Sequence, residues 1–399
     1  MLAGADCIDD TDLLRHGGMS RVFTGIRAPS TLGTFLRAFT HGHVQQLDRA
    51  GAGLLGGLTR QVPGLLADTG SRGIAFLDVD DTVREVHGYA KQAAGFGYTG
   101  LRGLNVQLAT ISSPSAAPVI ARARLRRGNT ASATGVDRLL AQAISTARAA
   151  GVDAQILARA DSAYYGHAFV GTALRHRVGF SVTARMTATV RSAIAGIDPG
   201  AWTPIRYPHA IFDADEGRWV SDAEVAEVDF VAFTGRRKAE HVPCRLVARR
   251  VRRLQPLAGD GSAQGELFAA HRHHAFITNT ALGTIEADQV HRGHAIVEQV
   301  IAELKANALA HLPSGRYAAN AAWVSCAVIA FNLARAAAAV AANLATARWA
   351  TLRTRITVPA RVATTGRRVI LHLPTHWPWA TAWEQLWATA TGPPPLPTP

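Results

Sequence analysis

A short apolar strand that ends in carboxylates constrains the fold of this chain more than any other segment. Residues 74–82 read IAFLDVDDT, and strand alternation places Asp78 and Asp80 on one face and Asp81 on the other. Carboxylates at the end of an apolar strand are costly to desolvate unless they bind a metal ion or a hydrogen-bond donor. The segment is therefore a candidate site. The alternative interpretation is that the aspartates only cap the following turn.

The next segments have the order of a layered α/β domain. Strand-like runs are expected at residues 104–111 and 118–125, a helix at 134–150, and a strand ending in an aspartate at 154–161. Three strands, a helix and a strand ending in a carboxylate is the order of the ribonuclease H-like fold, in which the later strand lies beside the first. The sequence therefore predicts a mixed sheet flanked by helices, with the later aspartate brought close to Asp80.

A helical segment at residues 291–305, HRGHAIVEQVIAELK, supplies a further carboxylate. With a turn of about 100° per residue, one arc of this helix holds His291, His294, Glu298 and Lys305. Apolar residues occupy another side, so the helix can bury one face and hold Glu298 at its edge. Together with Asp80 and Asp161, Glu298 can hold two Mg²⁺ ions about 4 Å apart, as in-line phosphoryl transfer on a nucleic acid requires. The alternative is an ordinary amphipathic helix with solvated charge pairs.

The long interval between Asp161 and Glu298 predicts a β-rich insertion at residues 197–277. Its strand-like runs are residues 218–220, 224–233 and 244–250. The insertion also contains the most basic tracts of the chain, and the candidates for DNA contact are Arg236, Arg237, Lys238, Arg249 and Arg250. The alternative for these tracts is a solvated loop.

The other segments complete the predicted domain plan. A helical N-terminal region is expected at residues 1–67. Its basic side chains are candidate DNA contacts, and its glycines at 51–57 are expected to interrupt a helix. The catalytic domain is expected at residues 68–196 and 278–350, and a C-terminal segment with a disordered, proline-rich tail at 351–399.

Composition favours a globular protein with a polyanionic partner. The chain has 42 Lys and Arg against 29 Asp and Glu, a net charge of +13, which favours nucleic acid over a membrane surface. Cys7, Cys244 and Cys326 are far apart without CxxC spacing, so neither a disulfide framework nor a zinc site is expected. No secretion signal is recognised at the start. The apolar segment at 318–333 contains polar residues and is expected to be a buried helix rather than a membrane span.

With the three carboxylates placed, the chain resembles the DDE transposases of bacterial insertion sequences. It is most similar to the branch with a β-rich insertion and a Tyr, Arg, Glu and Lys helix signature, although His291 and His294 stand here for Tyr and Arg. The segments LDVDDT, LARADSAYYG, LRRGNTAS and HLPSG also resemble family motifs. Related transposases begin with an additional end-recognition segment, so the resemblance implies a truncated N-terminus.

The resemblance also implies an activity and roles for individual residues. It implies an Mg²⁺-dependent transposase, with Mn²⁺ able to substitute, that cuts the element's ends and joins the 3′-hydroxyl to target DNA. The implied catalytic metal ligands are Asp80, Asp161 and Glu298, with Asp78 as an alternative first ligand or a residue that orients Asp80. His291, His294 and Lys305 would contact phosphate near the scissile bond. Trp202 or Trp219 would stack on an extruded base, with an ordinary exposed or core tryptophan as the alternative. The protein would act as a homodimer on double-stranded DNA in the cytoplasm, associated with the nucleoid and without a membrane.

Two rival functions account for parts of the sequence. Residues 78–82 also match the DxDxT motif of haloacid-dehalogenase-like phosphatases, whose later acidic pair would fall nearest to Asp260. No apolar strand precedes Asp260, and the basic charge does not suit a small-phosphate enzyme. A decayed, non-catalytic DNA-binding transposase is the other rival, and the intact Asp80, Asp161 and Glu298 argue against it.

Overall fold

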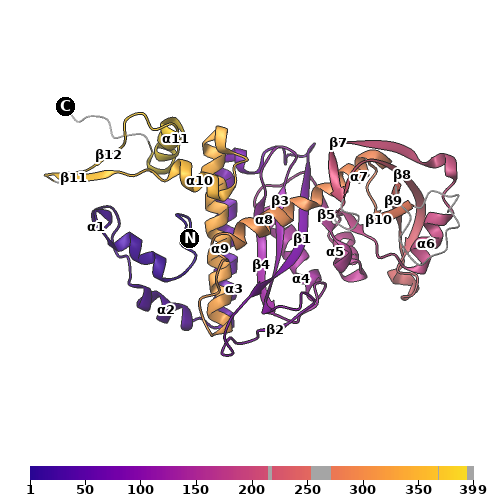
Figure 1. Cartoon of the computed structure of the whole chain (residues 1–399), viewed down its shortest axis with the longest axis horizontal. Helices are drawn as coiled ribbons and strands as arrows, with labels where there is room; N and C mark the ends of the chain where they lie inside the picture. Colours follow the sequence, from indigo (N-terminus) through magenta and orange to yellow (C-terminus); the bar gives the residue numbers. More distant parts are fainter. Residues whose placement is uncertain (214–217, 253–270, 367, 393–399) are drawn as a thin grey trace. The chain divides into compact units, whose positions relative to one another are not determined.

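The computed structural model describes residues 1–213, 218–252, 271–366 and 368–392, without side-chain detail at 206–222, 252 and 342. Its contacts divide the chain into two compact units (Figure 1). Unit 1 is Met1–Ile156 with Ile296–Pro399, and unit 2 is Leu157–Ala295. Unit 2 is longer than the β-rich insertion expected at 197–277, because the second aspartate-bearing strand and the segments after it pack with the insertion strands.

The strands of unit 1 form the expected antiparallel meander. They are β1 (Ile74–Glu85), β2 (Gly95–Phe96), β3 (Arg102–Ser112) and β4 (Val119–Arg127). β3 pairs with β1 and β4, and also with the short β2. In the β1–β3 register, Asp80 lies opposite Leu108 and Asp81 lies opposite Gln107, so the two carboxylates face opposite sides of the sheet.

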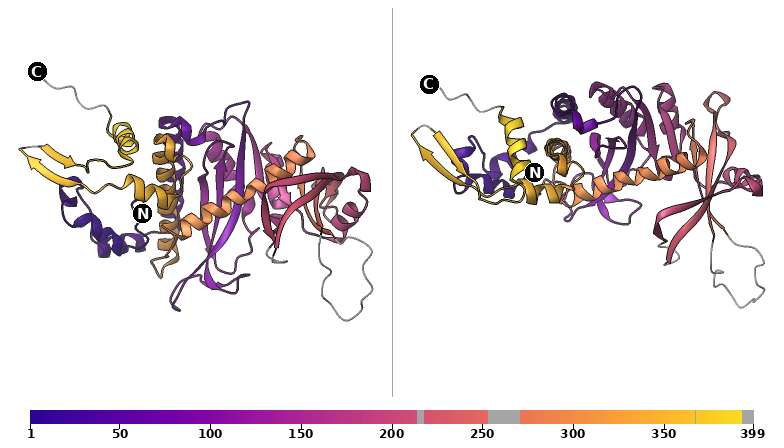
Figure 2. Two further views of the ribbon diagram at one scale, coloured as in Figure 1. Left: turned by 45° about the horizontal axis from the view of Figure 1, so that its top comes forward. Right: turned by 90° about the horizontal axis from the view of Figure 1, so that it is seen from above.

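Helices cover both faces of this sheet. α4 (Val136–Ala149) covers the Asp81 face, where Arg122 and Arg124 of β4 donate hydrogen bonds to Thr146 at 2.9 Å and Gln142 at 2.5 Å. α8 (Ile296–Lys305) and α9 (Tyr317–Val340) pack against the other face, and α8 crosses β1 and β3 in Figures 1 and 2. Asp80 therefore shares its side of the sheet with the helix that carries Glu298.

The N-terminal region is helical, as expected. It comprises η1 (Asp9–Arg15), α1 (Met19–Val22), α2 (Pro29–Arg37), α3 (His41–Gln61) and η2 (Pro63–Leu66). The interruption expected at residues 51–57 is wrong, since α3 runs through them. A Cβ at Gly56 would lie 3.3 Å from the Ala149 carbonyl oxygen and one at Gly51 would lie 3.4 Å from Ile329, so these glycines allow close packing inside a helix.

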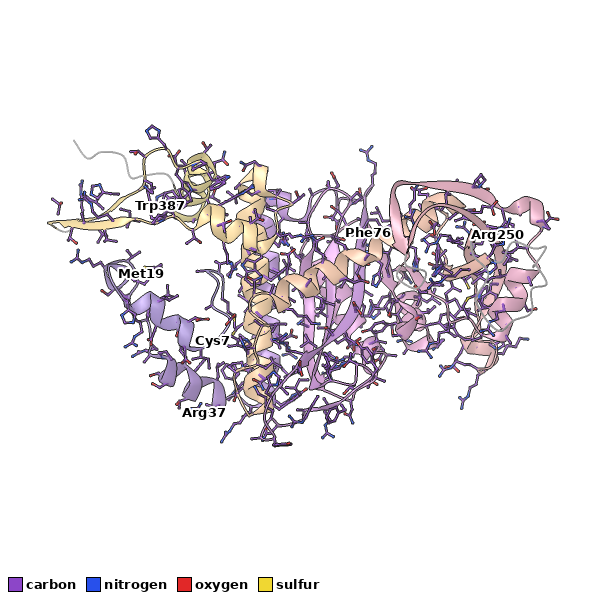
Figure 3. The ribbon with its side chains drawn as sticks, in the orientation of Figure 1. Cys7, Met19, Arg37, Phe76, Arg250 and Trp387 are labelled. Carbon is purple, nitrogen blue, oxygen red and sulfur yellow. The ribbon has the colours of Figure 1, made fainter. Side chains whose placement is uncertain are left out.

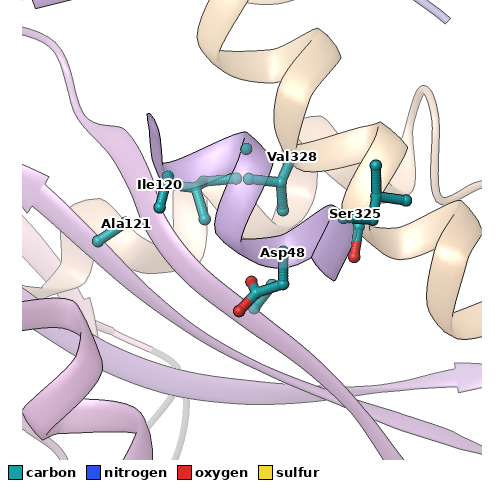
Figure 4. A pocket seen from close by; sticks show the side chains of 9 residues that line it. Asp48, Ile120, Ala121, Ser325 and Val328 are labelled. Carbon is teal, nitrogen blue, oxygen red and sulfur yellow. The ribbon is translucent and has the colours of Figure 1, made fainter. Parts of the chain in front are cut away.

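α9 is a core helix of unit 1. It is long and apolar enough to span a membrane by composition, but it is largely buried in the hydrophobic core against β3, β4 and α8, as the sequence predicted. The Asn332 amide accepts from the Ile120 N–H at 2.8 Å and donates to the Ile120 carbonyl at 2.9 Å. A cavity of about 10 Å³ between α3, β4 and α9, beside Asp48 and Val328, has room for about one water molecule (Figure 4).

The C-terminal part of unit 1 has more structure than the sequence indicated. It contains α10 (Trp349–Ile356), a hairpin of β11 (Arg361–Thr365) and β12 (Arg368–His372), and α11 (Ala380–Thr391), seen in yellow in Figure 2. The proline-rich end, residues 393–399, lies outside the described residues.

Unit 2 combines the second aspartate-bearing strand with the insertion. β5 (Gln155–Ala160) pairs in parallel with β6 (Gly179–Thr183), which makes the sheet mixed. The order then continues antiparallel through β10 (His271–Thr278), β9 (Val242–Arg252), β8 (Arg218–Ala232) and β7 (Thr203–Asp213). The helices are α5 (His167–Arg175), α6 (Ala188–Ala195) and α7 (Thr284–Arg292), with the short η3 (Ser162–Tyr164), η4 (Pro199–Ala201) and η5 (Lys238–Glu240). The two strand-like runs expected at 218–220 and 224–233 form the single strand β8.

Candidate active site

The carboxylates of β1 have different surroundings. Asp81 is 7% exposed, and its Oδ2 accepts hydrogen bonds from Asn105 at 2.5 Å and from Arg126 at 2.6 Å. Both partners lie on the α4 side of the sheet. Asp81 is therefore held in a buried ion pair within the fold, whereas Asp78 and Asp80 face the side covered by α8.

Asp80 is half-buried and lies near basic groups of unit 1. Its Oδ1 accepts the backbone N–H of Asp81 at 2.7 Å. Burial lowers the pKa of Lys305, the nearby Arg84 lowers it further, and Asp80 opposes these effects. Arg84 itself donates to the Ala310 carbonyl. The structure thus brings Asp80 and Lys305 close enough to interact electrostatically, and Arg84 is a neighbour that the sequence analysis did not single out.

Glu298 is exposed on α8. Val297, Val300, Ile301 and Leu304 bury the opposite side of the same helix in the core of unit 1. Lys305 follows Glu298 by seven positions, about two helical turns, so both side chains fall on one side of α8. The predicted arrangement of a buried apolar face with Glu298 at its edge is confirmed for residues 296–305.

Asp161 belongs to unit 2, at the carboxyl end of β5. It caps η3, because its side chain accepts the Ala163 N–H at 3.0 Å. Arg185 donates to the carbonyls of Ser162 at 3.0 Å and Ala163 at 3.3 Å, which fixes the turn after Asp161 from a second side. Thus Asp80 and Glu298 share unit 1, whereas Asp161 belongs to unit 2.

The sequence of the whole chain identifies its family. A family model described as transposase DDE domain group 1 matches residues 1–391. The chain belongs to the DDE transposases. Its mixed α/β architecture agrees with the ribonuclease H-like fold of that family. The comparison with curated proteins found no match.

The helix of this transposase that leads to Glu298 is broken, contrary to the continuous helix expected at 291–305. α7 ends at Arg292, residues Gly293–Ala295 form the 3-10 turn η6, and α8 begins at Ile296. Arg159 of β5, which is 2% exposed, donates to the carbonyls of Val290 and Gly293 at the end of α7. A Cβ at position 293 would lie 2.8 Å from Arg159 Nη1, so any other residue there would require the guanidinium to shift.

The two histidines of the signature occupy the region of this break. Ser181 and Thr183 of β6 lie 2.8 and 3.0 Å from Nδ1 and Nε2 of His291, and the imidazole stacks on Phe276 at 4.1 Å between ring centres. In this structure His291 therefore anchors α7 to the sheet, and both of its ring nitrogens already face hydroxyl groups. His294 is half-buried in η6.

The two basic tracts of the insertion have different environments. Arg236, Arg237 and Lys238 are exposed at the turn between β8 and β9. This turn lies close to the segment after Asp161, since Phe233 contacts the Tyr165 ring at 5.4 Å between centres. Arg236 also pairs with Glu240 at 2.9 Å. The turn therefore presents basic side chains to solvent beside the Asp161 region of unit 2.

Arg249 and Arg250 are on β9, and acidic residues of unit 2 contact both. Arg249 lies 3.8 Å from Asp288, which is 2% exposed, and Arg250 binds Glu224 at 2.6 Å. Arg250, labelled in Figure 3, also covers the Trp202 ring at 4.3 Å. In this structure both arginines are half-buried and pair with acidic side chains of unit 2, whereas the basic residues of the turn are exposed.

The tryptophans predicted to stack on a base differ in what the structure describes. Trp202 is 9% exposed beneath Arg250, with His273 at 6.0 Å between ring centres, so its surroundings correspond to the alternative of a core tryptophan. Trp219 lies on β8, and its side chain is outside the described residues. Asp260, the acidic residue considered for a phosphatase, is outside them as well.

A group of possible metal ligands near the N-terminus was not predicted. One ligand atom from each of Asp6, Cys7 and Asp10 lies within 4.8 Å of the others. The Asp10 Oδ2 accepts the backbone N–H groups of Asp6 at 2.9 Å and Cys7 at 3.1 Å, and these bonds lower the pKa of Asp10. A turn stabilised by its own carboxylate accounts for this group without a metal ion.

Proposed function

We propose that the chain cuts the ends of an insertion sequence and joins the freed 3′-hydroxyl to target DNA by two-metal phosphoryl transfer. The family match over residues 1–391 carries this proposal. It is supported by Asp80 and Glu298, which lie in one unit on a strand and a helix that pack together. The remaining carboxylate, Asp161, would join them from the end of β5.

The donor set suits magnesium. Asp80, Asp161 and Glu298 offer carboxylate oxygens, which are the ligands that Mg²⁺ and Mn²⁺ prefer. Asp80 is half-buried and Glu298 is exposed, so both can be reached from solvent, whereas the Oδ2 of Asp81 is engaged by Arg126. Asp78, which is fully buried on the Asp80 face, would orient Asp80 or act as the first ligand in its place. When bound, the ions would activate water and then the 3′-hydroxyl and offset the charge on the reacting phosphate.

The basic residues would position the DNA. Lys305 lies near Asp80 and would bind a phosphate oxygen next to the carboxylates, and His294 would do the same when protonated. Arg236, Arg237 and Lys238 would contact the DNA backbone farther away. Because an element has two ends, the acting form would be a homodimer on double-stranded DNA, in the cytoplasm and associated with the nucleoid.

The test uses DNA that flanks the gene for this chain, since an insertion sequence surrounds its own transposase gene. We expect purified protein to cleave this DNA at the element boundary with Mg²⁺ or Mn²⁺, and to bind it without cleavage in Ca²⁺. Binding without cleavage in both active metals would identify a non-catalytic DNA-binding relative instead. Cleavage that persists in excess chelator would refute the metal-dependent mechanism.

A further inference from the structure

A surface of unit 1 that the proposed chemistry does not use carries exposed aromatic side chains. Residues 86–101, which connect β1 to β3 and include β2, are called the aromatic loop below (Figure 1, around the β2 label). Tyr89 is 100% exposed, Tyr98 69% and Phe96 68%. Aromatic rings are among the largest apolar groups, and three of them exposed on one short connection indicate a binding surface.

Backbone contacts hold the aromatic loop in place. The Gln92 N–H donates to the Gly315 carbonyl at 2.9 Å, and the Gly128 N–H donates to the Ala93 carbonyl at 3.1 Å. Gly95 pairs with Gly103 in the β2–β3 ladder. A Cβ on Gly128 would lie 2.0 Å from the Gly103 carbonyl oxygen, so the backbones approach as closely as glycine permits. The rings are thus exposed on a fixed frame, which lowers the entropy lost on binding.

The charged side chains of the aromatic loop are basic, although the exposed Glu85 lies directly before it. No Asp or Glu occurs in residues 86–136. Lys91 and Arg102 belong to or adjoin the loop, and the Arg102 guanidinium lies 5.9 Å from the Tyr89 ring centre. Exposed Arg127 lines an open hollow of about 660 Å³ together with Gln92, Asn129 and Tyr317. This surface therefore offers cations and amides for phosphate beside rings for flat apolar groups.

We propose that the aromatic loop binds unpaired bases of DNA at the element end, with the bases stacked on Tyr89, Phe96 and Tyr98 and the phosphates held at Arg102 and Arg127. Nucleic acid supplies both a polyanionic backbone and flat bases, one on each nucleotide along the strand. A protein partner could pack against the aromatic rings, but it would also need an acidic surface to pair with the basic side chains of the loop. The inference rests on the proposed DNA transposition, and it assigns base stacking to this loop, since Trp202 of the insertion is buried.

The experiment measures DNA binding in chelator, so that no cleavage occurs. A blunt duplex of the element end is compared with the same duplex carrying a short unpaired tail that contains a fluorescent base analogue. We expect the wild-type chain to prefer the tailed DNA and to quench the analogue. Tyr89→Ala, Phe96→Ala and Tyr98→Ala should each weaken tail binding, by roughly 5- to 150-fold for a stacking ring, and leave the affinity for blunt DNA near the wild-type value.

Matched variants separate stacking from general effects. Tyr89→Phe and Tyr98→Phe keep the ring and should bind tailed DNA like wild type. Phe35→Ala removes a ring of α2, outside the loop, that is 60% exposed, and it should leave the binding of both DNAs unchanged. Arg127→Ala should weaken tailed DNA more than blunt DNA and lower the salt dependence of tail binding, since it removes a phosphate contact of the bound tail. Thermal unfolding of each variant checks that the exposed substitutions leave the fold intact.

Distinct outcomes overturn this inference and the proposed function. Alanine variants that bind tailed DNA like wild type would overturn the stacking assignment. Alanine variants that lose self-association instead would also overturn it, and would show that the loop binds a second copy of the chain. The chain with Glu298→Gln should keep its preference for tailed DNA although it cannot cleave. A tail preference without any cleavage by the wild-type chain in Mg²⁺ would overturn the proposed chemistry alone, and cleavage without a tail preference would overturn this inference alone.

Discussion

The two ends of α8 carry glutamates with opposite surroundings. Glu298, near the start of the helix, is exposed. Glu303 is 7% exposed, and it binds Arg335 of α9 through both carboxylate oxygens at 2.8 Å and accepts the Trp349 N–H at 2.8 Å. β1 repeats the contrast, because Asp81 is buried against Arg126 while Asp80 remains half-exposed.

This difference separates charges that stabilise the fold from charges that are available for chemistry. A buried carboxylate that loses its partner leaves an uncompensated charge, so Glu303 and Asp81 are costly to change. An exposed carboxylate contributes little to folding, so Glu298 should be replaceable with little effect on stability. Variants at both kinds of carboxylate test this separation.

Substitution of the available carboxylates should abolish activity without unfolding the protein. Asp80→Asn, Asp161→Asn and Glu298→Gln each remove a proposed metal ligand, and we expect DNA cleavage to fall by roughly a thousandfold or more. Thermal unfolding and DNA binding should stay near wild type. Asp78→Asn is expected to be milder, and inactive Asp78→Asn beside active Asp80→Asn would move the ligand to Asp78.

Glu303→Gln is the matched control on the same helix. Loss of the buried charge facing Arg335 should destabilise the protein by about 3–5 kcal/mol, measured as the free energy of unfolding in denaturant. The fraction that remains folded should still cleave DNA. Two results would contradict this difference between the two glutamates of α8. One is a Glu303→Gln protein with wild-type stability, and the other is a Glu298→Gln protein destabilised by the amount expected for Glu303→Gln.

The two basic tracts should respond differently to salt. Arg237→Ala and Lys238→Ala remove exposed charges and should each lower the salt dependence of DNA binding by about one phosphate contact. Arg250→Ala should leave that slope unchanged and instead lower the stability of the insertion, because Arg250 pairs with Glu224 and covers Trp202. Equal slopes for all three variants would show that the β9 arginine also contacts DNA.

The smallest effect is expected from His273, beside Arg250. Burial lowers the pKa of His273, and His271 and Arg250 lower it further. A lowered pKa in the folded state means that the unfolded chain binds the proton more tightly, so stability is complete above the unfolded value of about 6.5 and falls as the pH drops below it. The temperature at the midpoint of thermal unfolding of the wild-type protein should be lower at about pH 5.5 than at about pH 7.5. His273→Gln should make this difference smaller. An unchanged pH dependence in the variant would contradict the assignment.

The elements with clear periodicity could be predicted from sequence. The alternation of β1 gave the faces of Asp78, Asp80 and Asp81, and the apolar stripe of α8 placed Glu298 at an edge. These features depend on neighbours in sequence. The glycines of α3 misled the prediction because close packing of a helix also selects glycine, and that reason is visible only in the tertiary contacts.

The features that could not be predicted depend on partners far away in sequence. The helix break at Gly293 requires Arg159 from β5, and the pairing of Arg249 with Asp288 requires a strand and a helix of different regions. A run of basic residues looks the same in sequence whether it forms a turn or a strand beside acidic neighbours. For the candidate site, the sequence indicated the carboxylates and Lys305, but not that Arg84 joins Lys305 or that hydroxyl groups surround His291.

The two hydrogen bonds between Asn332 and Ile120 have a consequence for solubility. Among the described strands, β4 pairs only with β3, so its other edge presents backbone groups that a strand of another molecule can join. The Asn332 amide satisfies the N–H and the carbonyl of Ile120 together, as a neighbouring strand would do. A side chain of α9 thereby closes the sheet at this residue and opposes aggregation through the β4 edge, most of all in newly synthesised chains at high local concentration.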